Sequence, residues 1–314
     1  MIARGKHMNF DLICIGMALV DSIIRGFNPE PVSASGYVAE SGSLNAGGEA
    51  VNAAVAAAKL GLKTGILCAL GNDAAGEMVL DTLRKGGVDT RSVVRTAATP
   101  VTTMFVRQDG TRKSITNQAH RFNFHPEKNP ELFTDAKTVL LGSLFRAPFD
   151  DPAVVRAVVN AAKSAGQLVF ADTKIPNFRA LTLADFRESL PQIDWITPNE
   201  DEARFFTGKE NPEEAADVFL EHGIKNVIIK LGGKGCLLKN RETTLHLPAL
   251  PVQAVDATGA GDNFAAGFVS EILRGTGQEE ALRFANACGA VCTTAVGAGT
   301  ALKDREQVLR MLEK

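Results

Sequence analysis

The sequence predicts an α/β protein in which a mainly parallel sheet lies between layers of helices. Short continuous apolar runs such as Phe10 to Gly16 (FDLICIG) are typical of strands buried on both faces of a parallel sheet. Helical segments such as Pro152 to Ala165 separate these runs, so that strands and helices alternate. Two stretches, 17–45 and 99–125, instead carry short β-like pieces without a helical repeat, which predicts a second, smaller sheet.

The further strands of the large sheet are expected from similar apolar runs. These runs are Gly65 to Leu70, Thr138 to Leu141, Leu168 to Asp172, Trp195 to Thr197 and Val227 to Leu231. Glycines mark the expected ends of the helices between them, because a glycine just past the last turn is a common helix stop. The stops are Gly61, Gly86, Gly166 and Gly208. Ligands of such sheets bind beyond the carboxyl ends of the strands, so we expect the functional groups at that edge.

A chain of 314 residues is expected to form one large domain, or one and a half. Residues 1–8 are interpreted as a vector-derived leader, with Met8 as the expected natural start. The remaining chain divides into a core and an inserted β lid. The core is predicted to comprise 9–16, 48–98 and 126–314, and the lid 17–47 and 99–125.

Composition excludes several classes of function. A net charge of −2 gives no general attraction to nucleic acid or to an anionic membrane. No apolar run is long enough to span a bilayer, and no signal-peptide pattern is present. The five cysteines form no Cys-x-x-Cys pair and the histidines no metal-binding spacing, so a protein-held histidine metal is not expected. We expect free thiols in a reducing cytoplasm.

The most informative stretch is Asp256-Ala-Thr-Gly-Ala-Gly-Asp262, where an extended segment turns into a helix. The first amides of a helix have no intrahelical partner and carry partial positive charge. Glycines at positions 259 and 261 let a phosphate approach these amides closely. An aspartate beside a phosphate site would repel the ligand, unless it takes the proton of the attacking group. We therefore predict that the amides of Gly259, Ala260 and Gly261 stabilise a transferring phosphoryl group and that Asp262 is the base.

A structural interpretation of the same stretch is that Asp262 only caps a helix and the glycines only permit a turn. For an isolated Gly-x-Gly-Asp this would be the better interpretation, because short glycine motifs match by chance. A second motif changes the balance. Gly47-Gly48-Glu49-Ala50-Val51-Asn52 opens a long Ala-rich helix near the N-terminus.

Together, these two motifs resemble the signature regions of the ribokinase-like carbohydrate kinases, the phosphofructokinase-B type of sugar kinase. The resemblance runs from about Phe10 to the last helix. It includes Thr197-Pro-Asn-Glu-Asp-Glu202, similar to the family's Asn-x-x-Glu motif, and Ala285-Asn286-Ala287. It implies a three-layer α/β/α core with a small β-sheet lid over the sugar, and an ATP-dependent sugar kinase with Mg²⁺ as cofactor. In the family the lid often serves as a dimer interface, so a homodimer through the lid is also implied.

On the acceptor side, the resemblance implies that Asp21 holds sugar hydroxyls, because a carboxylate offers two oxygens to two neighbouring hydroxyls. Asn52 and the amides of Gly47 and Gly48 are implied to face the same sugar. A solvated loop aspartate and a tolerated helical asparagine are the structural alternatives for Asp21 and Asn52.

On the nucleotide side, Asn199 and Glu202 share one helix face and are implied to order Mg²⁺ and the phosphates through water. They would equally make sense as a capping pair. The other implied nucleotide contacts are Lys230, Gly232, Gly235 and Asn286. In some members a monovalent cation binds at the position of Asp256, which implies K⁺ as a second cation.

The expected reaction is attack of a sugar hydroxyl on the γ-phosphorus of ATP while Asp262 takes the proton. The helix terminus is expected to lower the pKa of Asp262. A pentose or hexose is the leading acceptor class. Lys174 and Arg179 would instead suit an acidic sugar such as 2-keto-3-deoxygluconate, or simply pair with nearby acids. The segment Leu141 to Phe145 lacks the glutamate that ribokinase uses near this position, which argues against ribose as the acceptor.

Three other functions are weighed against this interpretation. A nucleoside kinase is less favoured, because one Trp and one Tyr offer little stacking surface for a purine. A dinucleotide-dependent oxidoreductase lacks its Gly-x-Gly-x-x-Gly after the first strand. A catalytically silent sugar-binding protein on the same fold would not need Asp262.

Overall fold

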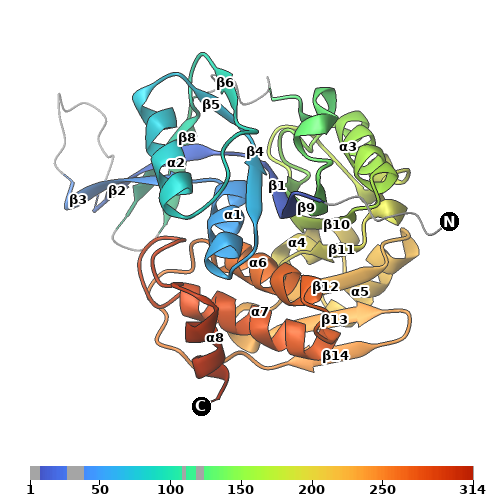
Figure 1. Ribbon diagram of the computed structural model, residues 1–314. Helices are drawn as coiled ribbons and strands as arrows, with labels where there is room; N and C mark the ends of the chain where they lie inside the picture. Colours follow the sequence, from blue (N-terminus) through green and yellow to red (C-terminus); the bar gives the residue numbers. More distant parts are fainter. Residues whose placement is uncertain (1–7, 27–38, 108–110, 118–123, 314) are drawn as a thin grey trace.

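A computed structural model describes residues 8–26, 39–107, 111–117 and 124–313. Its centre is an eight-stranded sheet in the order β14-β13-β12-β11-β10-β9-β1-β4 (Figure 1). Neighbouring strands from β4 to β12 pair in parallel, and β13 and β14 continue the sheet as an antiparallel hairpin. The strands are β1 (Phe10–Gly16), β4 (Thr64–Leu67), β9 (Ala136–Leu144), β10 (Leu168–Thr173), β11 (Trp195–Thr197), β12 (Asn226–Lys230), β13 (Cys236–Asn240) and β14 (Thr244–Leu247).

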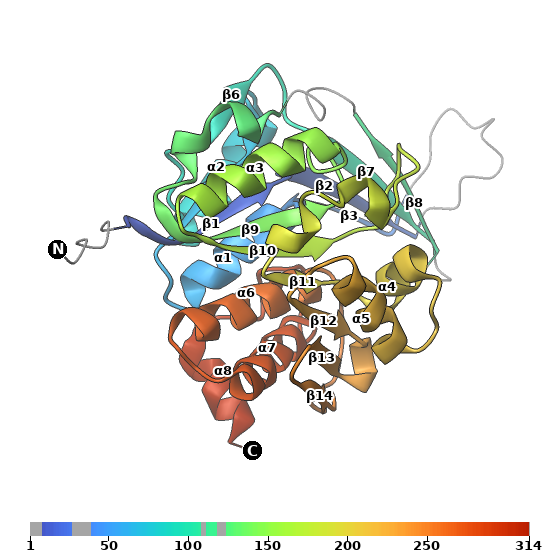
Figure 2. The same cartoon turned by 90° about the vertical axis from the view of Figure 1, so that its right-hand side faces the viewer.

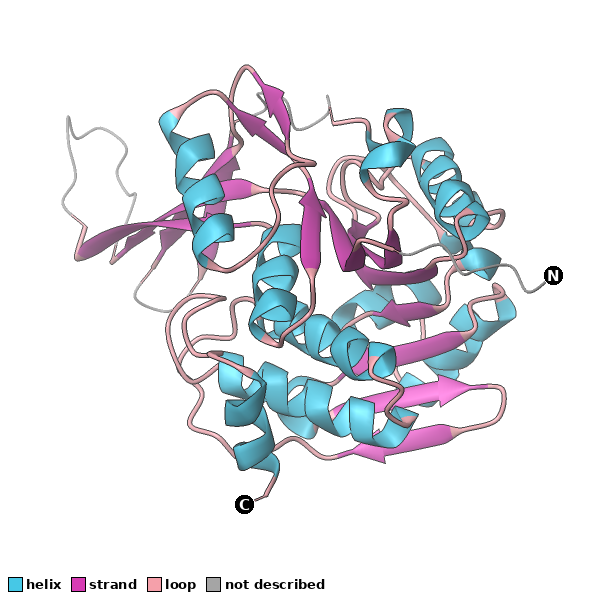
Figure 3. Cartoon of the chain, viewed as in Figure 1, coloured by secondary structure: helices cyan, strands magenta, loops and turns pink. Residues whose placement is uncertain are grey.

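Helices cover both faces of this sheet (Figure 3). One face carries α1 (Glu49–Lys59), α2 (Ala74–Lys85), α6 (Ala260–Leu273), α7 (Gln278–Cys292) and α8 (Arg305–Leu312). The other carries α3 (Pro152–Ser164), α4 (Glu200–Thr207) and α5 (Pro212–Glu221). Short 3₁₀ turns complete the chain: Pro126–Lys128, Pro130–Leu132, Leu183–Phe186, Leu190–Gln192 and Gly232–Lys234.

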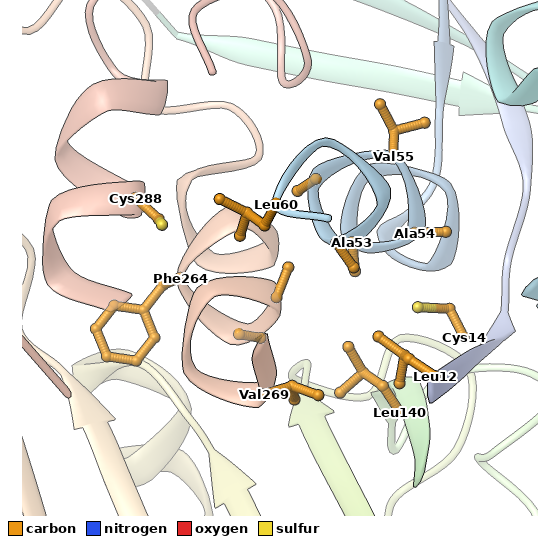
Figure 4. Close-up of a cluster of buried hydrophobic side chains, with 14 of the residues drawn as sticks. Leu12, Cys14, Ala53, Ala54, Val55, Leu60, Leu140, Phe264, Val269 and Cys288 are labelled. Atoms are coloured by element: carbon orange, nitrogen blue, oxygen red, sulfur yellow. The ribbon is translucent and has the colours of Figure 1, made fainter. Parts of the chain in front are cut away.

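The core consists of two apolar clusters, one on each face of the sheet. Successive side chains of a strand point to opposite faces. On β1, Leu12 and Cys14 accordingly join the cluster under α1 and α6, and Ile13 and Ile15 join the cluster under α3. Figure 4 shows the first cluster, where Phe264 of α6 lies between the sheet and its neighbouring helices. This packing fixes α1 and α6 against each other, which matters for the site below.

A smaller four-stranded sheet projects from the core, in the order β3-β2-β7-β8 (Figures 1 and 2). It contains β2 (Leu19–Arg25), β3 (Ser41–Gly47), β7 (Val101–Val106) and β8 (Arg112–Thr116). The sheet is mixed, because β2 pairs in parallel with β7 and the other neighbours are antiparallel. Nearby, β5 (Ala69–Gly71) and β6 (Val94–Thr96) form a two-stranded ribbon.

The layered core with a small β lid confirms the predicted fold. One expected strand, Gly65 to Leu70, is in fact two, because the chain leaves β1 after Leu67 and pairs from Ala69 with β6. The hairpin of β13 and β14 was not predicted; its strands are short, at five and four residues. Among the described residues, no helix is long and apolar enough to cross a membrane.

Candidate active site

The turn into α6 has the geometry expected of an anion site. Gly259 adopts φ 76°, and a Cβ there would lie 2.2 Å from the Cβ of Ala298, so both conformation and space require glycine. The amides of Gly259 and Gly261 have no hydrogen-bond acceptor among the described residues. The Ala260 amide differs from the prediction, because it donates to the carbonyl of Ala257 at 3.2 Å. Two of the three predicted amides are therefore free to meet a phosphate.

Asp262, in the first turn of α6, is buried, with 8% of its surface exposed. Asn52 of α1 donates a hydrogen bond to its Oδ2 at 2.8 Å. Burial raises the pKa of Asp262 to about 7; the charges of Glu49 and Asp172 also raise this pKa, whereas Lys174 and the bond from Asn52 lower it. The prediction of a lowered pKa is therefore wrong. The effect of the helix terminus, which would lower this pKa, is smaller than the combined effect of burial and of the charges of Glu49 and Asp172, which raise it.

Of the residues predicted to hold the sugar, Asn52 contacts Asp262 directly, and Asp21 lies beside Gly47, just before α1. Asp21 lies on β2 opposite Asn45 of β3. A Cβ added to Gly47 would lie 2.4 Å from Oδ2 of Asp21. Gly48, with φ 103°, begins α1 and brings Asn52 to Asp262 one turn later. No described residue donates a hydrogen bond to the Asp21 carboxylate, and burial followed by the charge of Glu49 raises its pKa to about 6.

On the opposite side, Asn199 and Glu202 form a reciprocal capping box at the start of α4. The Asn199 side chain accepts from the Glu202 amide at 2.9 Å, and Glu202 Oε2 accepts from the Asn199 amide at 2.9 Å. Thr173 Oγ1 donates to the same Oε2 at 2.8 Å. Burial, the largest influence, raises the pKa of Glu202. The capping interpretation is confirmed, and it leaves Oε1 of Glu202 without a donor among the described residues.

Lys230, at the end of β12, connects this side to α6. Its Nζ lies 2.6 Å from Oδ1 of Asp172, which also accepts from Thr197 Oγ1 at 2.7 Å. A Cβ on Gly261 would lie 3.1 Å from the same Nζ. Gly232 has open space around it, whereas Gly235, at φ 102°, lies directly against the Leu247 carbonyl. The turn therefore requires glycine at position 235.

The remaining predicted residues hold loops near the start of α6. Asn286 donates to the Pro248 carbonyl at 2.7 Å. Asp256 accepts from the Thr258 amide at 3.0 Å and from the Gly297 amide at 3.0 Å, and these bonds help to lower its pKa against the opposing effect of burial. Two exposed valines flank this region: Val255, whose amide donates to the Thr293 carbonyl, and Val296.

The sequence interpretation assigned no role to two residues that share this site. Glu49, the first residue of α1, acts electrostatically on Asp21 and Asp262. Asp172 accepts the bonds of Lys230 and Thr197 described above. Both residues could have been singled out by their place in the sequence. Glu49 lies inside the motif Gly47 to Asn52, and Asp172 ends a predicted strand. Neither position fixed the direction of its side chain.

Comparison with known proteins identifies the class. Residues 10–305 match the profile of the pfkB family carbohydrate kinases, and the chain belongs to this family of phosphotransferases. It is 32% identical to a ribokinase of Haemophilus influenzae over 273 residues, covering 85% of this chain and 87% of the relative. It is 32% identical to a probable fructokinase-5 of Arabidopsis thaliana over 311 residues, covering 93% and 94%.

Solved structures agree with this assignment. The structure of Arabidopsis thaliana ribokinase complexed with ribose and ATP superposes with a TM-score of 0.87 at 30% identity, over 98% of this chain and 100% of that one. A putative ribokinase II of E. coli in complex with ATP and Mg²⁺ superposes with a TM-score of 0.78 at 25% identity, covering 96% and 99%.

Proposed function

We propose that this carbohydrate kinase transfers the γ-phosphoryl group of ATP to a hydroxyl of a neutral pentose or hexose, with Asp262 as the base. The observation that carries the proposal is the buried Asp262 carboxylate at the mouth of α6, hydrogen-bonded by Asn52 of α1. A carboxyl with a pKa of about 7 is well suited to take a proton near neutral pH. The relatives named for ribose or fructose support a neutral sugar as acceptor.

The proposed step is an in-line displacement. The sugar hydroxyl oxygen forms a bond to the γ-phosphorus, the bond from that phosphorus to the β,γ-bridging oxygen breaks, and ADP leaves. The hydroxyl proton passes to the Asp262 carboxylate. The free amides of Gly259 and Gly261 stabilise the negative charge on the transferring group. Asp21 and Asn52 orient the sugar so that one hydroxyl faces Asp262.

The carboxylates of Glu202 and Asp172 fit a Mg²⁺ ion that is bound through water molecules. Among the described residues, no cluster of three metal-ligating His, Cys, Asp or Glu side chains occurs. Mg²⁺ keeps several waters and needs few protein ligands. Glu202 and Asp172 are buried residues, and Oε1 of Glu202 and Oδ2 of Asp172 accept no hydrogen bond from the described residues, so that they would hold such waters. When bound, Mg²⁺ supplies positive charge to the phosphates of the nucleotide.

Two finer points belong to the same proposal. Asp256 and the carbonyls of the loop near Ala298 are proposed to hold a monovalent cation such as K⁺. The lid is proposed to form a homodimer. Its edge strands carry exposed apolar residues in support of this, with Leu44 of β3 61% exposed and Ile115 of β8 68% exposed.

The acidic-sugar alternative loses one of its two residues. Arg179 is 50% exposed and engages the Asp150 carbonyl and Asp151, outside the carboxylate cluster around Asp262. The negative charges of Glu49 and Asp262 act on Lys174, but the same charges would repel a sugar carboxylate.

The test is ADP release from ATP and Mg²⁺ over a panel of pentoses, hexoses, 2-keto-3-deoxygluconate and nucleosides, with and without K⁺. We expect turnover with a neutral pentose or hexose. Turnover confined to the acidic sugar or to nucleosides would reject the acceptor class. No ADP release with any acceptor would favour a silent sugar-binding protein.

A further inference from the structure

Asn263 is a buried polar residue in the first turn of α6, directly after the proposed base, with 1% of its surface exposed. Its Nδ2 donates hydrogen bonds to two backbone carbonyls, that of Gly259 at 2.8 Å and that of Ala298 at 2.9 Å. Its backbone amide also donates to the Gly259 carbonyl, at 2.9 Å. One side chain therefore connects the turn at the start of α6 to the loop that follows α7.

These two acceptors account for an amide side chain at position 263. Asn is a poor residue inside a helix, because its side chain competes for backbone hydrogen bonds. In addition, Oδ1 of Asn263 is buried and accepts no hydrogen bond from the described residues, which is unfavourable. A leucine of similar volume would avoid both costs but would donate no hydrogen bond. Local costs of this kind are typical of functional sites.

Asn263 and Ala298 together hold the Gly259 backbone at two points. The Gly259 carbonyl accepts from Asn263 twice, and the Gly259 Cα packs against Ala298, where an added Cβ would lie 2.2 Å from the Ala298 Cβ. A glycine is otherwise free to rotate about φ and ψ. Because the carbonyl and the Cα are both held, the direction of the Gly259 N–H is fixed as well. The next peptide is planar, so the same carbonyl also sets the direction of the Ala260 N–H.

Ala298 can serve as an anchor because its own loop is tied to helices on several sides. Nζ of Lys59, in the last turn of α1, donates to the carbonyls of Gly299 at 2.6 Å and Leu302 at 2.9 Å. Sγ of Cys292, at the end of α7, donates to the Ala298 carbonyl at 3.4 Å. Asn263 adds the connection to α6. The loop is therefore a fixed wall against Gly259.

We propose that Asn263 is a positioning residue for the phosphoryl-binding turn. It holds the Gly259 and Ala298 carbonyls together, so that the free amides of Gly259 and Gly261 are aligned before the phosphoryl group arrives. This inference rests on the proposed function, in which those amides stabilise the charge on the transferring group. Donors that are already aligned stabilise a transition state more than donors that must reorient during the reaction. Asn263 acts through the turn, because its own side chain is buried.

The test compares Asn263→Leu and Asn263→Ser with the control Asn226→Leu. Leucine keeps the approximate volume of the side chain but removes both donors. A serine hydroxyl has one proton, which it can donate to the Gly259 carbonyl four residues before it, but not to Ala298 at the same time. Asn226 is a matched control, because its Nδ2 also donates to a loop carbonyl, that of Asp194 at 2.9 Å. It lies at the start of β12, at the end of the strand away from the site.

Steady-state kinetics with the best sugar of the panel gives the first readout. For Asn263→Leu we expect kcat to fall about tenfold, with the KM values of ATP and of the sugar within about threefold, because alignment of the amides matters most when charge develops. Asn263→Ser should show a smaller fall. Asn226→Leu should keep kcat within about twofold of the wild type.

Binding gives a readout that a general loss of stability would not move. Calorimetry compares ADP alone with ADP plus aluminium fluoride, a mimic of the transferring phosphoryl group, in the presence of Mg²⁺ and the sugar. Asn263→Leu should bind ADP within about twofold of the wild type and the aluminium fluoride complex about tenfold more weakly.

Hydrogen exchange of the ligand-free proteins, followed by mass spectrometry, tests the anchoring itself. The hydrogen-bonded amides between residues 258 and 263 should exchange faster in Asn263→Leu, because the turn opens more often without its anchor. The same amides should exchange at the wild-type rate in Asn226→Leu.

A kcat for Asn263→Leu within twofold of the wild type would overturn the inference, and so would equal weakening of ADP and of the aluminium fluoride complex. Equal losses of kcat in Asn263→Leu and Asn226→Leu would assign the effect to stability alone. Recovery of kcat at tenfold higher K⁺ would assign it to the proposed cation site instead.

If the wild type phosphorylates no sugar, the proposed function fails, whereas hydrogen exchange still tests the anchoring, and unchanged exchange in Asn263→Leu would overturn it. If Asn263→Leu does not fold, Asn263→Ser takes its place in every measurement, with Asn226→Ser as its control.

Discussion

The carboxylates on the side proposed for the nucleotide (the donor side) and those on the side proposed for the sugar (the acceptor side) differ in how they are hydrogen-bonded. On the donor side, Asp172 accepts from Thr197 and Lys230, and Glu202 accepts from Thr173 and the Asn199 amide. On the acceptor side, Asp262 accepts one bond, from Asn52. Asp21 and Glu49 accept none from the described residues.

This difference in hydrogen bonding fits the ligands proposed for the two sides. The nucleotide is the same in every turnover, so a donor side with fixed hydrogen bonds is already organised for it. A sugar offers several hydroxyls, and each can donate to a carboxylate oxygen. The acceptor side therefore holds acceptors that a polyol can satisfy. Burial, followed by the charge of Glu49, raises the pKa values of Asp21 and Asp262 to about 6 and about 7.

The largest effect that would test this division is expected at Asp262. Asp262→Asn keeps the shape and an acceptor for Asn52 but removes the base. We expect kcat to fall about 10³-fold, with the affinity for nucleotide within about threefold. Steady-state kinetics and calorimetry measure the two quantities. The control Asp201→Asn changes an exposed aspartate on α4 and should leave kcat unaltered. A kcat within tenfold of the wild type would remove Asp262 as the base.

The fold could be predicted from the sequence, because buried parallel strands and glycine-marked helix ends are local signals. Asp262, Asn52 and Asp21 could be proposed as site residues, because they lie in or near recognisable motifs. The pKa of Asp262 was predicted in the wrong direction for a specific reason. A helix terminus is visible in one segment, but the opposing charges of Glu49 and Asp172 come from two other segments. Side-chain convergence of this kind depends on tertiary packing.

Asp21 provides the next test of the division. Asp21→Asn replaces one of the two carboxylate oxygens of residue 21 by an NH₂ group and removes the charge. A hydrogen bond to a charged group contributes about 1.5–3 kcal/mol. We expect the KM of the sugar to rise roughly 10- to 100-fold, while the KM of ATP stays within about twofold. On the donor side, Thr173→Val removes the bond to Glu202 and should change the KM of ATP more than that of the sugar. The opposite pattern in the pair would contradict the assignment of the two sides.

The smallest expected effect concerns the pH dependence of stability. The folded-state pKa of Asp262, about 7, lies above its ordinary value of 3.8, so the folded protein holds a proton that the unfolded chain has released between these values. Stability from this group is therefore fully present below about pH 3.8 and is lost as pH rises through about 7. Asp21 acts in the same direction, up to about pH 6.

We therefore expect Asp262→Asn to melt above the wild type at pH 8, by roughly 2–4 °C for each kcal/mol of repulsion removed. The difference between the two proteins should shrink as pH falls to 5, because the wild-type carboxyl is then protonated as well. Glu202 also has a raised pKa, but it is present in both proteins and cancels in the difference. Differential scanning calorimetry at pH 5, 6, 7 and 8 measures it, with Asp81→Asn as the control for an exposed helical aspartate. A constant difference across this range would mean that Asp262 is ionised throughout, and that the acceptor side does not store the repulsion inferred from its geometry.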